Sequence, residues 1–190
     1  VATAMRSPLG VGGARFHVGG SAGPADTVYL GVFKKSALLS VGLYDERFTR
    51  AQDWELNYRL RQSGGIIWFD PRLVVTYRSR PTLKALAKQY FEYGRWRRVV
   101  SRRHAGTINY RYLAPPLALV GFISSLIAGI FAPILFAPAG IYVLFVLAAS
   151  IKIASSIREY FLLLAVIPTM HFAWGAGFIT SPKTLVPASQ

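Results

Sequence analysis

The chain has 190 residues, no cysteine and a formal net charge of +14. This length allows one or two domains, and the lack of cysteine excludes disulfides and thiolate chemistry, as suits a reducing compartment. The charge is uneven, because residues 1–112 hold 19 basic and 7 acidic side chains whereas residues 113–190 hold three and one. We therefore place a domain boundary near Tyr112, between a basic polar half and an apolar half.

The polar half opens with a glycine-rich stretch, residues 9–23, which leads into Pro24. A glycine-rich loop can bind phosphate, but here no strand precedes it and no Gly-Lys-Ser/Thr follows it. We interpret it as a connecting loop, with a phosphate site as the less favoured alternative. The chain begins with Val1 rather than methionine, and we expect it to be a piece of a longer protein.

Strands are predicted where β-branched and aromatic residues cluster, which is over residues 27–33, 66–69 and 73–77. Between and after them, helical patterns occupy residues 34–41, the stretch from Asp53 to Gly64, and a segment that opens at Pro81. Alternating helices and strands are typical of an α/β fold. The strands are too few for a complete sheet, so we expect the front of the domain to lie upstream.

The helix that starts at Asp53 is predicted to place Leu56 and Leu60 on one face. The next helix is predicted to carry a stripe of Leu83, Leu86, Ala87 and Tyr90. Gly94 lies farther along and is a candidate break in it.

The apolar half has no charged residue over the 40 positions from Tyr112 to Ile151. One transmembrane helix needs about 20 apolar residues. A turn signal at residues 137–140 divides the run into two helices, 113–136 and 139–157. A third span is possible over 160–182, where Pro168 leaves a re-entrant or interfacial arrangement open. A buried hairpin of a soluble protein is the disfavoured alternative.

Basic side chains precede the first span, without an acid after Glu92. Basic residues close to a span mark the cytoplasmic side, and each contributes about 1 kcal/mol of attraction to anionic lipid. Lys152 and Arg158 fall on the same side if the first two spans form a hairpin. This basic belt comprises Arg95, Arg97, Arg98, Arg102, Arg103 and Arg111.

Three polar elements occur in a fixed order before the spans: residues 41–48 (VGLYDERF), residues 52–64 (QDWELNYRLRQSG), and Gln89 followed by Arg95-Trp96. In this order they resemble the rear half of membrane-bound family 2 glycosyltransferases of the GT-A fold, over residues of about 25–180. The usual Gln-to-Arg gap of that family is two residues, whereas five separate them here. The resemblance implies the C-terminal part of a GT-A domain over 1–112 and a helical membrane region over 113–190.

By this resemblance, the protein is an inverting transferase that moves a sugar from a nucleotide sugar to a lipid-linked or cell-envelope glycan. Asp53 resembles the base, and the dipole of a helix start favours its ionised form. Arg95, with Gln89 and Trp96, is the candidate for binding the donor diphosphate. Asp26 is a candidate near the acceptor. The plainer alternatives are a helix cap for Asp53, a turn acid for Asp26 and an interfacial anchor for Trp96.

The family's metal site, an Asp-x-Asp after a strand, is absent from these 190 residues. We therefore expect a divalent cation, Mg or Mn, in the full enzyme, with its ligands and the donor-binding half outside this chain. His17 and His104 do not stand at metal-ligand spacing from other ligand types, and His171 is expected to be a packed helix residue.

The resemblance further implies a bacterial inner-membrane protein with a cytoplasmic catalytic domain. Two or three spans favour addition of single sugars over polymerisation. A second hypothesis is a non-catalytic basic membrane module that binds anionic lipid or a protein partner. Nucleic-acid binding is disfavoured, because no module pattern appears and the charge adjoins the membrane.

Overall fold

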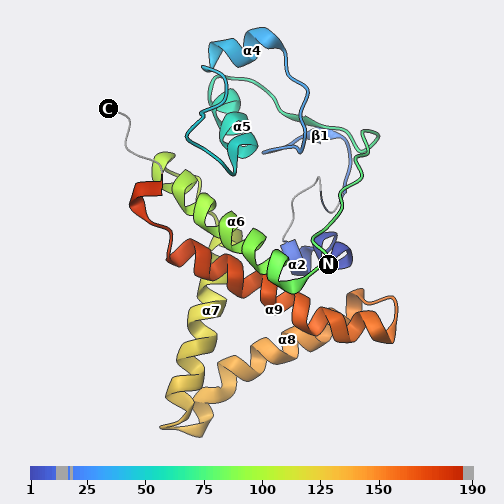
Figure 1. The fold of residues 1–190 in the computed structure, drawn as a ribbon, viewed down its shortest axis with the longest axis vertical. Helices are drawn as coiled ribbons and strands as arrows, with labels where there is room; N and C mark the ends of the chain where they lie inside the picture. The colour runs from blue at the N-terminus through green and yellow to red at the C-terminus, as the bar shows by residue number, and fades with distance from the viewer. Residues whose placement is uncertain (12–16, 18, 186–190) are drawn as a thin grey trace.

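The computed structural model describes residues 1–11, 17 and 19–185, most of which are helical. An upper lobe of loops and short elements lies above a group of long helices (Figure 1). The lobe contains β1 (Gly23–Pro24), α4 (Lys35–Ser40), α5 (Gln52–Gln62) and β2 (Trp68–Phe69). The long helices are α6 (Leu83–Arg103), α7 (Tyr110–Gly129), α8 (Ala137–Ile153) and α9 (Ile157–Ile179), with the short elements α1 (Ala2–Met5), α2 (Pro8–Val11), η1 (Pro133–Phe136) and η2 (Lys183–Leu185).

The α/β fold predicted from the sequence is not shown. In the described residues the one sheet has two antiparallel strands, with Gly23 opposite Phe69 and Pro24 opposite Trp68. Part of the strand predicted over 66–69 is therefore present, whereas those over 27–33 and 73–77 were wrong. A strand needs a neighbour that accepts its backbone hydrogen bonds. These two segments have no such neighbour in the described chain and stay open, with Val32 98% exposed and Val74 84% exposed.

The short helices of the lobe confirm the sequence predictions. Helix α4 lies within the predicted 34–41, and Gly42 follows it with a φ of +79°, a left-handed conformation that glycine adopts without strain. Helix α5 buries Leu56 and Leu60 as expected and is followed by Gly64, whose φ is +87°. The buried face of α5 packs against Ile67 and the α4 region.

Helix α6 begins as predicted, because the Thr82 hydroxyl accepts a hydrogen bond from the Ala85 N–H at 3.2 Å. The predicted break at Gly94 was wrong, since the helix runs through it to Arg103. A Cβ on Gly94 would lie 2.0 Å from the carbonyl oxygen of Trp174 in α9. The missing side chain therefore serves a close approach between α6 and α9, which lie side by side in Figure 1.

Three helical stretches are long and apolar enough to cross a membrane by length and composition: 110–129, 133–153 and 157–179. This agrees with the larger of the two predicted numbers of spans. The chain reverses between α7 and η1, at 130–132, rather than at the predicted 137–140. Pro138 does not break the helix, because it lies at the start of α8, where the backbone N–H has no helical partner to lose. Helix α9 continues past Pro168, although it crosses α7 rather than running beside it (Figure 1).

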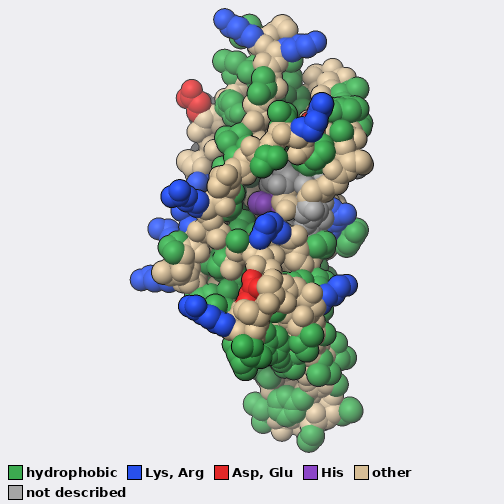
Figure 2. Space-filling view, turned by 90° about the vertical axis from the view of Figure 1, so that its right-hand side faces the viewer, with side chains coloured by type: hydrophobic (Ala, Val, Ile, Leu, Met, Phe, Trp, Pro, Cys, Tyr) green, Lys and Arg blue, Asp and Glu red, His purple; other side chains and the backbone are tan. Residues whose placement is uncertain are grey.

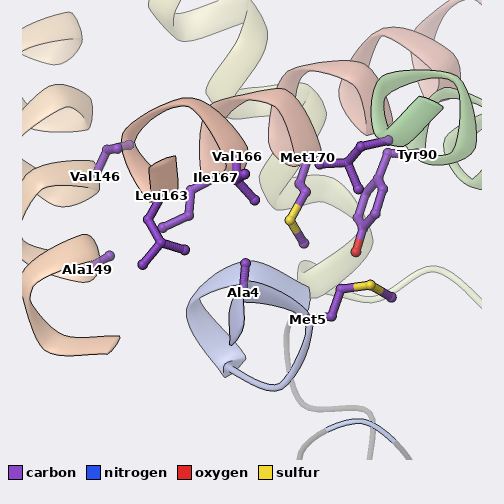
Figure 3. Packing of buried hydrophobic residues seen from close by; sticks show 10 residues of the cluster. Ala4, Met5, Tyr90, Val146, Ala149, Leu163, Val166, Ile167 and Met170 are labelled. Carbon is purple, nitrogen blue, oxygen red and sulfur yellow. The ribbon is translucent and has the colours of Figure 1, made fainter. Parts of the chain in front are cut away.

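The main core joins α6 to the membrane helices and to α1 (Figure 3). Helix α9 contributes the centre of this core, and α6 adds Leu86 and Tyr90, the inward part of its predicted stripe. His171 is a packed residue of α9, as expected, and contacts the Tyr142 hydroxyl at 3.1 Å. The cluster consists of Ala4, Met5, Leu86, Tyr90, Val146, Ala149, Leu163, Val166, Ile167 and Met170.

Hydrophobic and basic side chains occupy different parts of the surface along the long axis of the molecule. In the space-filling view the lower end is almost wholly hydrophobic, while Lys and Arg side chains stand over the middle and upper parts (Figure 2). The lower end corresponds to the meeting point of α7 and α8 in Figure 1. A hydrophobic end below a basic belt is the distribution that a membrane-inserted hairpin needs.

Candidate functional site

Asp53 is the second residue of α5, and its backbone position differs from that of a simple cap. The N-cap is Ala51, with a φ of +59° and no side-chain hydrogen bond. The Tyr44 hydroxyl interacts with the Asp53 carboxylate. Burial raises the pKa of Asp53 above its ordinary value, and the interaction with Tyr44 opposes that rise. Burial thus opposes the predicted preference for the ionised form: the proton affinity of Asp53 is increased, which suits a general base.

Tyr44 also lines a cleft of about 420 Å³ in the upper lobe. Its walls come from three parts of the chain: the loop after α4, the middle of α5 and the end of α6. Positive and negative side chains are mixed along them, so the cleft offers both hydrogen-bond donors and acceptors. The lining residues are Gly42, Tyr44, Asp45, Glu46, Arg47, Glu55, Arg59, Arg103 and His104.

A buried carboxylate, Glu55, organises one wall of this cleft. It is 2% exposed and accepts hydrogen bonds from Arg59 at 2.8–3.0 Å, while His104 Nε2 lies 3.0 Å from Oε1. Arg59 also donates to the carbonyl oxygens of Val41 and Leu43. The network therefore ties α5 to the loop that carries Tyr44 and to the end of α6.

The cleft is also lined by an arginine-bound carboxylate, Asp45. Arg47 donates to it from its backbone N–H at 3.1 Å and from its side chain at 2.8 Å, and Arg103 lies 3.9 Å away. The Arg47 hydrogen bonds hold the pKa of Asp45 below its usual range. Asp45 is thus a fixed acceptor, in contrast to Asp53, whose pKa moves the other way.

Trp96 lies beneath the start of α5. It is 4% exposed and contacts Phe48, with ring centroids 5.8 Å apart. The same cluster includes Ala51 and Trp54, which flank Asp53. The indole is therefore buried in this cluster and supports the segment that carries Asp53.

Gln89 and Arg95 lie on α6 without a hydrogen bond or ion pair to Asp53 in the described chain. The Gln89 amide donates to the hydroxyls of Tyr77 and Tyr93 at 2.8 and 2.6 Å. Arg95 pairs with Glu92 at 3.0 Å. Their expected part in donor binding stays a prediction.

Asp26 lies at the other end of α5. Its carboxylate is 3.5 Å from Arg61 and its side chain is 82% exposed. No ion pair or hydrogen bond joins Asp26 to Asp53 in the described residues, and a place for Asp26 near the acceptor stays a prediction.

The basic belt of the sequence is only partly a free surface. Arg97 is 7% exposed, so its expected place in an exposed belt was wrong. Arg102 donates to the carbonyl oxygens of Ser181 and Pro182 at 2.8 and 3.1 Å, and Arg98 lies 5.0 Å from the ring centroid of Phe178. Arg98 and Arg102 therefore contact a ring and carbonyl oxygens that are distant in sequence and that the fold brings near them.

Sequence reasoning missed several residues of the cleft. Tyr44 and Arg59 belong to the motifs at residues 41–48 and 52–64, but the sequence suggested no function for either side chain. His104 was considered only as a metal ligand. The partner of His104 is Glu55, 49 residues earlier, so no short sequence spacing predicts the pair. In residues 1–11, 17 and 19–185 no group of three His, Cys, Asp or Glu could hold a metal ion.

Two curated proteins are similar to this chain. The chain is 31% identical over 179 residues to the succinoglycan biosynthesis protein ExoA of Rhizobium meliloti, covering 93% of this chain and 54% of that protein. The chain is related to proteins of glycan biosynthesis. It is also 28% identical over 136 residues to a dolichyl N-acetyl-α-D-glucosaminyl phosphate 3-β-D-2,3-diacetamido-2,3-dideoxy-β-D-glucuronosyltransferase of Methanococcus voltae, covering 71% of this chain and 40% of that enzyme.

The chain thus spans about half the length of the curated relatives it matches. No protein-family model matches it, and no solved structure matches it significantly.

Proposed function

We propose that this chain is the acceptor side of a membrane-bound inverting glycosyltransferase of family 2, with the C-terminal part of a GT-A domain. It would move a sugar from a nucleotide sugar to a lipid-linked or cell-envelope glycan. The observation that carries the proposal is the Asp53 carboxylate. It lies at a helix start, its pKa is raised by burial, and it interacts with Tyr44, which lines the cleft.

The chemistry follows from what an inverting transfer requires. An acceptor hydroxyl attacks the anomeric carbon of the donor, the bond from that carbon to the diphosphate breaks, and the hydroxyl proton passes to a base. Asp53 is that base in our proposal. The Tyr44 hydroxyl, which lines the cleft, interacts with this carboxylate and favours its ionised form.

The leaving nucleoside diphosphate needs positive charge. We assign Arg95 to it, together with Gln89 of the same helix α6; this assignment rests on the family resemblance. A divalent cation, Mg or Mn, belongs to the same proposal. The described residues contain no cluster of three suitable ligands, so the residues that hold this cation would lie elsewhere in the full enzyme.

We also place the lobe on the cytoplasmic side of the bacterial inner membrane. The support is charge: Arg111, Lys152 and Arg158 flank the three apolar stretches at the ends away from the hydrophobic tip. Basic flanks of this kind favour the cytoplasmic side. A lipid-linked acceptor would then meet the lobe at the membrane surface.

A transfer assay tests this proposal. The protein is expressed from its complete reading frame, and membranes that contain it are given a panel of labelled nucleotide sugars. We expect label from one donor in lipid-extractable or polymeric glycan, with the anomeric configuration inverted relative to the donor. Label in no fraction, together with binding to anionic vesicles, would instead support the non-catalytic membrane module.

A further inference from the structure

Arg97 is a buried cation held between two aromatic rings. Its guanidinium carbon lies 3.8 Å from the ring centroid of Trp54 and 3.6 Å from that of Tyr112. Two rings this close to one planar group must cover its opposite faces. Its Nη2 donates to the carbonyl oxygen of Thr107 at 2.8 Å, while its Nε has no hydrogen-bond partner in the described chain.

This arrangement is unlike an ordinary ion pair, because no carboxylate pairs with Arg97 in the described chain. Burial lowers its pKa to about 10, which still leaves it charged at neutral pH. A cation is attracted to the face of an aromatic ring, and the attraction is stronger when the cation is removed from water. A planar guanidinium can use both of its faces in this way, whereas a lysine ammonium cannot stack.

The stack continues on the side of α5. Trp54 stacks on Tyr58 with centroids 5.5 Å apart, and Tyr58 contacts the ring of His104 at 4.6 Å. His104 lines the cleft and meets Glu55. This half of the stack therefore ends at the candidate site.

On the other side the stack enters the long helices. Tyr112, the third residue of α7, stacks on Trp174 of α9 with centroids 6.3 Å apart. Trp174 stacks on Phe178 at 5.3 Å, and Arg98 covers Phe178. One column of rings and guanidinium groups thus joins α9 and α7 to α5 through Arg97.

We propose that Arg97 is a positioning residue that fixes α5, and with it Asp53, relative to the membrane-entering helix α7. Trp54 directly follows Asp53, so the ring that Arg97 holds belongs to the turn that carries the base. If the proposed function holds, this contact sets the place of the base relative to an acceptor that arrives from the membrane. The positioning itself is a property of the fold and is tested separately.

A distance measurement tests the positioning. The chain has no cysteine, so cysteines at exposed Gln62 in α5 and exposed Leu117 in α7 take spin labels at two sites only. We expect one narrow distance distribution in the protein in lipid nanodiscs. Arg97→Lys keeps the charge but loses the stack, and it should broaden or shift that distribution.

Matched variants separate the stack from general damage. Tyr112→Phe keeps the ring face and Tyr112→Leu removes it, so only the second should broaden the distribution. Lys88→Gln removes one charge from an exposed position of α6 and should leave it unchanged. If the distributions for Arg97→Lys and Tyr112→Leu both match the wild type, the positioning role of Arg97 is overturned.

A kinetic readout tests the consequence for catalysis. Displacing a reacting group by about 1 Å costs roughly 100-fold in rate, so Arg97→Lys should slow transfer by roughly 10- to 100-fold with donor affinity unchanged. A changed distance with unchanged transfer would overturn the catalytic consequence. If the wild-type protein transfers no sugar, the proposed function fails, and the distance distributions alone still decide the positioning.

Discussion

The close approach of α6 and α9 at Gly94 makes a sharp prediction about stability. In Gly94→Ala the new Cβ would lie 2.0 Å from the Trp174 carbonyl oxygen and 2.8 Å from the Phe178 nitrogen. Ordinary contact begins near 3.4 Å, so the shortfall is 1.4 Å. Both neighbours are backbone atoms, so one helix must move away from the other.

The cost follows from what that movement separates. Overpacking a well-packed site costs about 1–3 kcal/mol, and we expect the upper end because no side chain can rotate out of the way. This cost is partly offset, because alanine stabilises a helix interior by about 1 kcal/mol relative to glycine. The net loss in the free energy of unfolding is therefore about 2 kcal/mol.

Gly121→Ala is the matched control, because nothing lies within 4 Å of the Cβ it would add on α7. Unfolding of the detergent-solubilised protein, followed by far-ultraviolet circular dichroism, compares the two variants. We expect Gly121→Ala to be neutral or slightly stabilising. Equal stability of the two variants would refute the close packing of α6 against α9.

Two further predictions concern the cleft. Glu55→Gln leaves the Arg59 guanidinium without its buried carboxylate; breaking such a pair costs about 3–5 kcal/mol, and we expect the lower end because Arg59 is 23% exposed. Chemical denaturation checks this against Glu46→Gln, an exposed neighbour in the same cleft that should change little. Tyr44→Phe removes the hydroxyl that lowers the pKa of Asp53, so this pKa should rise further. Because the base must be unprotonated, the acidic limb of the pH–rate profile should move to higher pH, and an unmoved limb would show that Asp53 does not set it.

Local sequence signals predicted the helices well. Leu56 and Leu60 recur at helical spacing, and Gly64 takes the left-handed conformation that follows a helix end. These features depend on neighbours a few residues away. The strand at 73–77 failed for the complementary reason: its composition suits a sheet, but a strand also needs a partner from elsewhere in the fold.

The candidate site was predictable only in part. The sequence pattern singled out Asp53 and the structure places it in the first turn of α5, but its role as the base stays a prediction. Its partner Tyr44 and the cleft residue His104 come together through tertiary contacts without a fixed spacing. In the sequence, Arg97 cannot be distinguished from the neighbouring arginines, because its contacts with Trp54 and Tyr112 form only in the folded chain.

The most direct test of the account is transfer by Asp53→Asn in the protein expressed from its complete reading frame, measured together with donor affinity. Loss of a general base costs about 100- to 10,000-fold in rate. We predict a loss in that range with donor affinity unchanged, and no loss in Asp70→Asn, whose carboxylate pairs with Arg72 at the surface. Wild-type turnover by Asp53→Asn would contradict the assignment of Asp53 as the base.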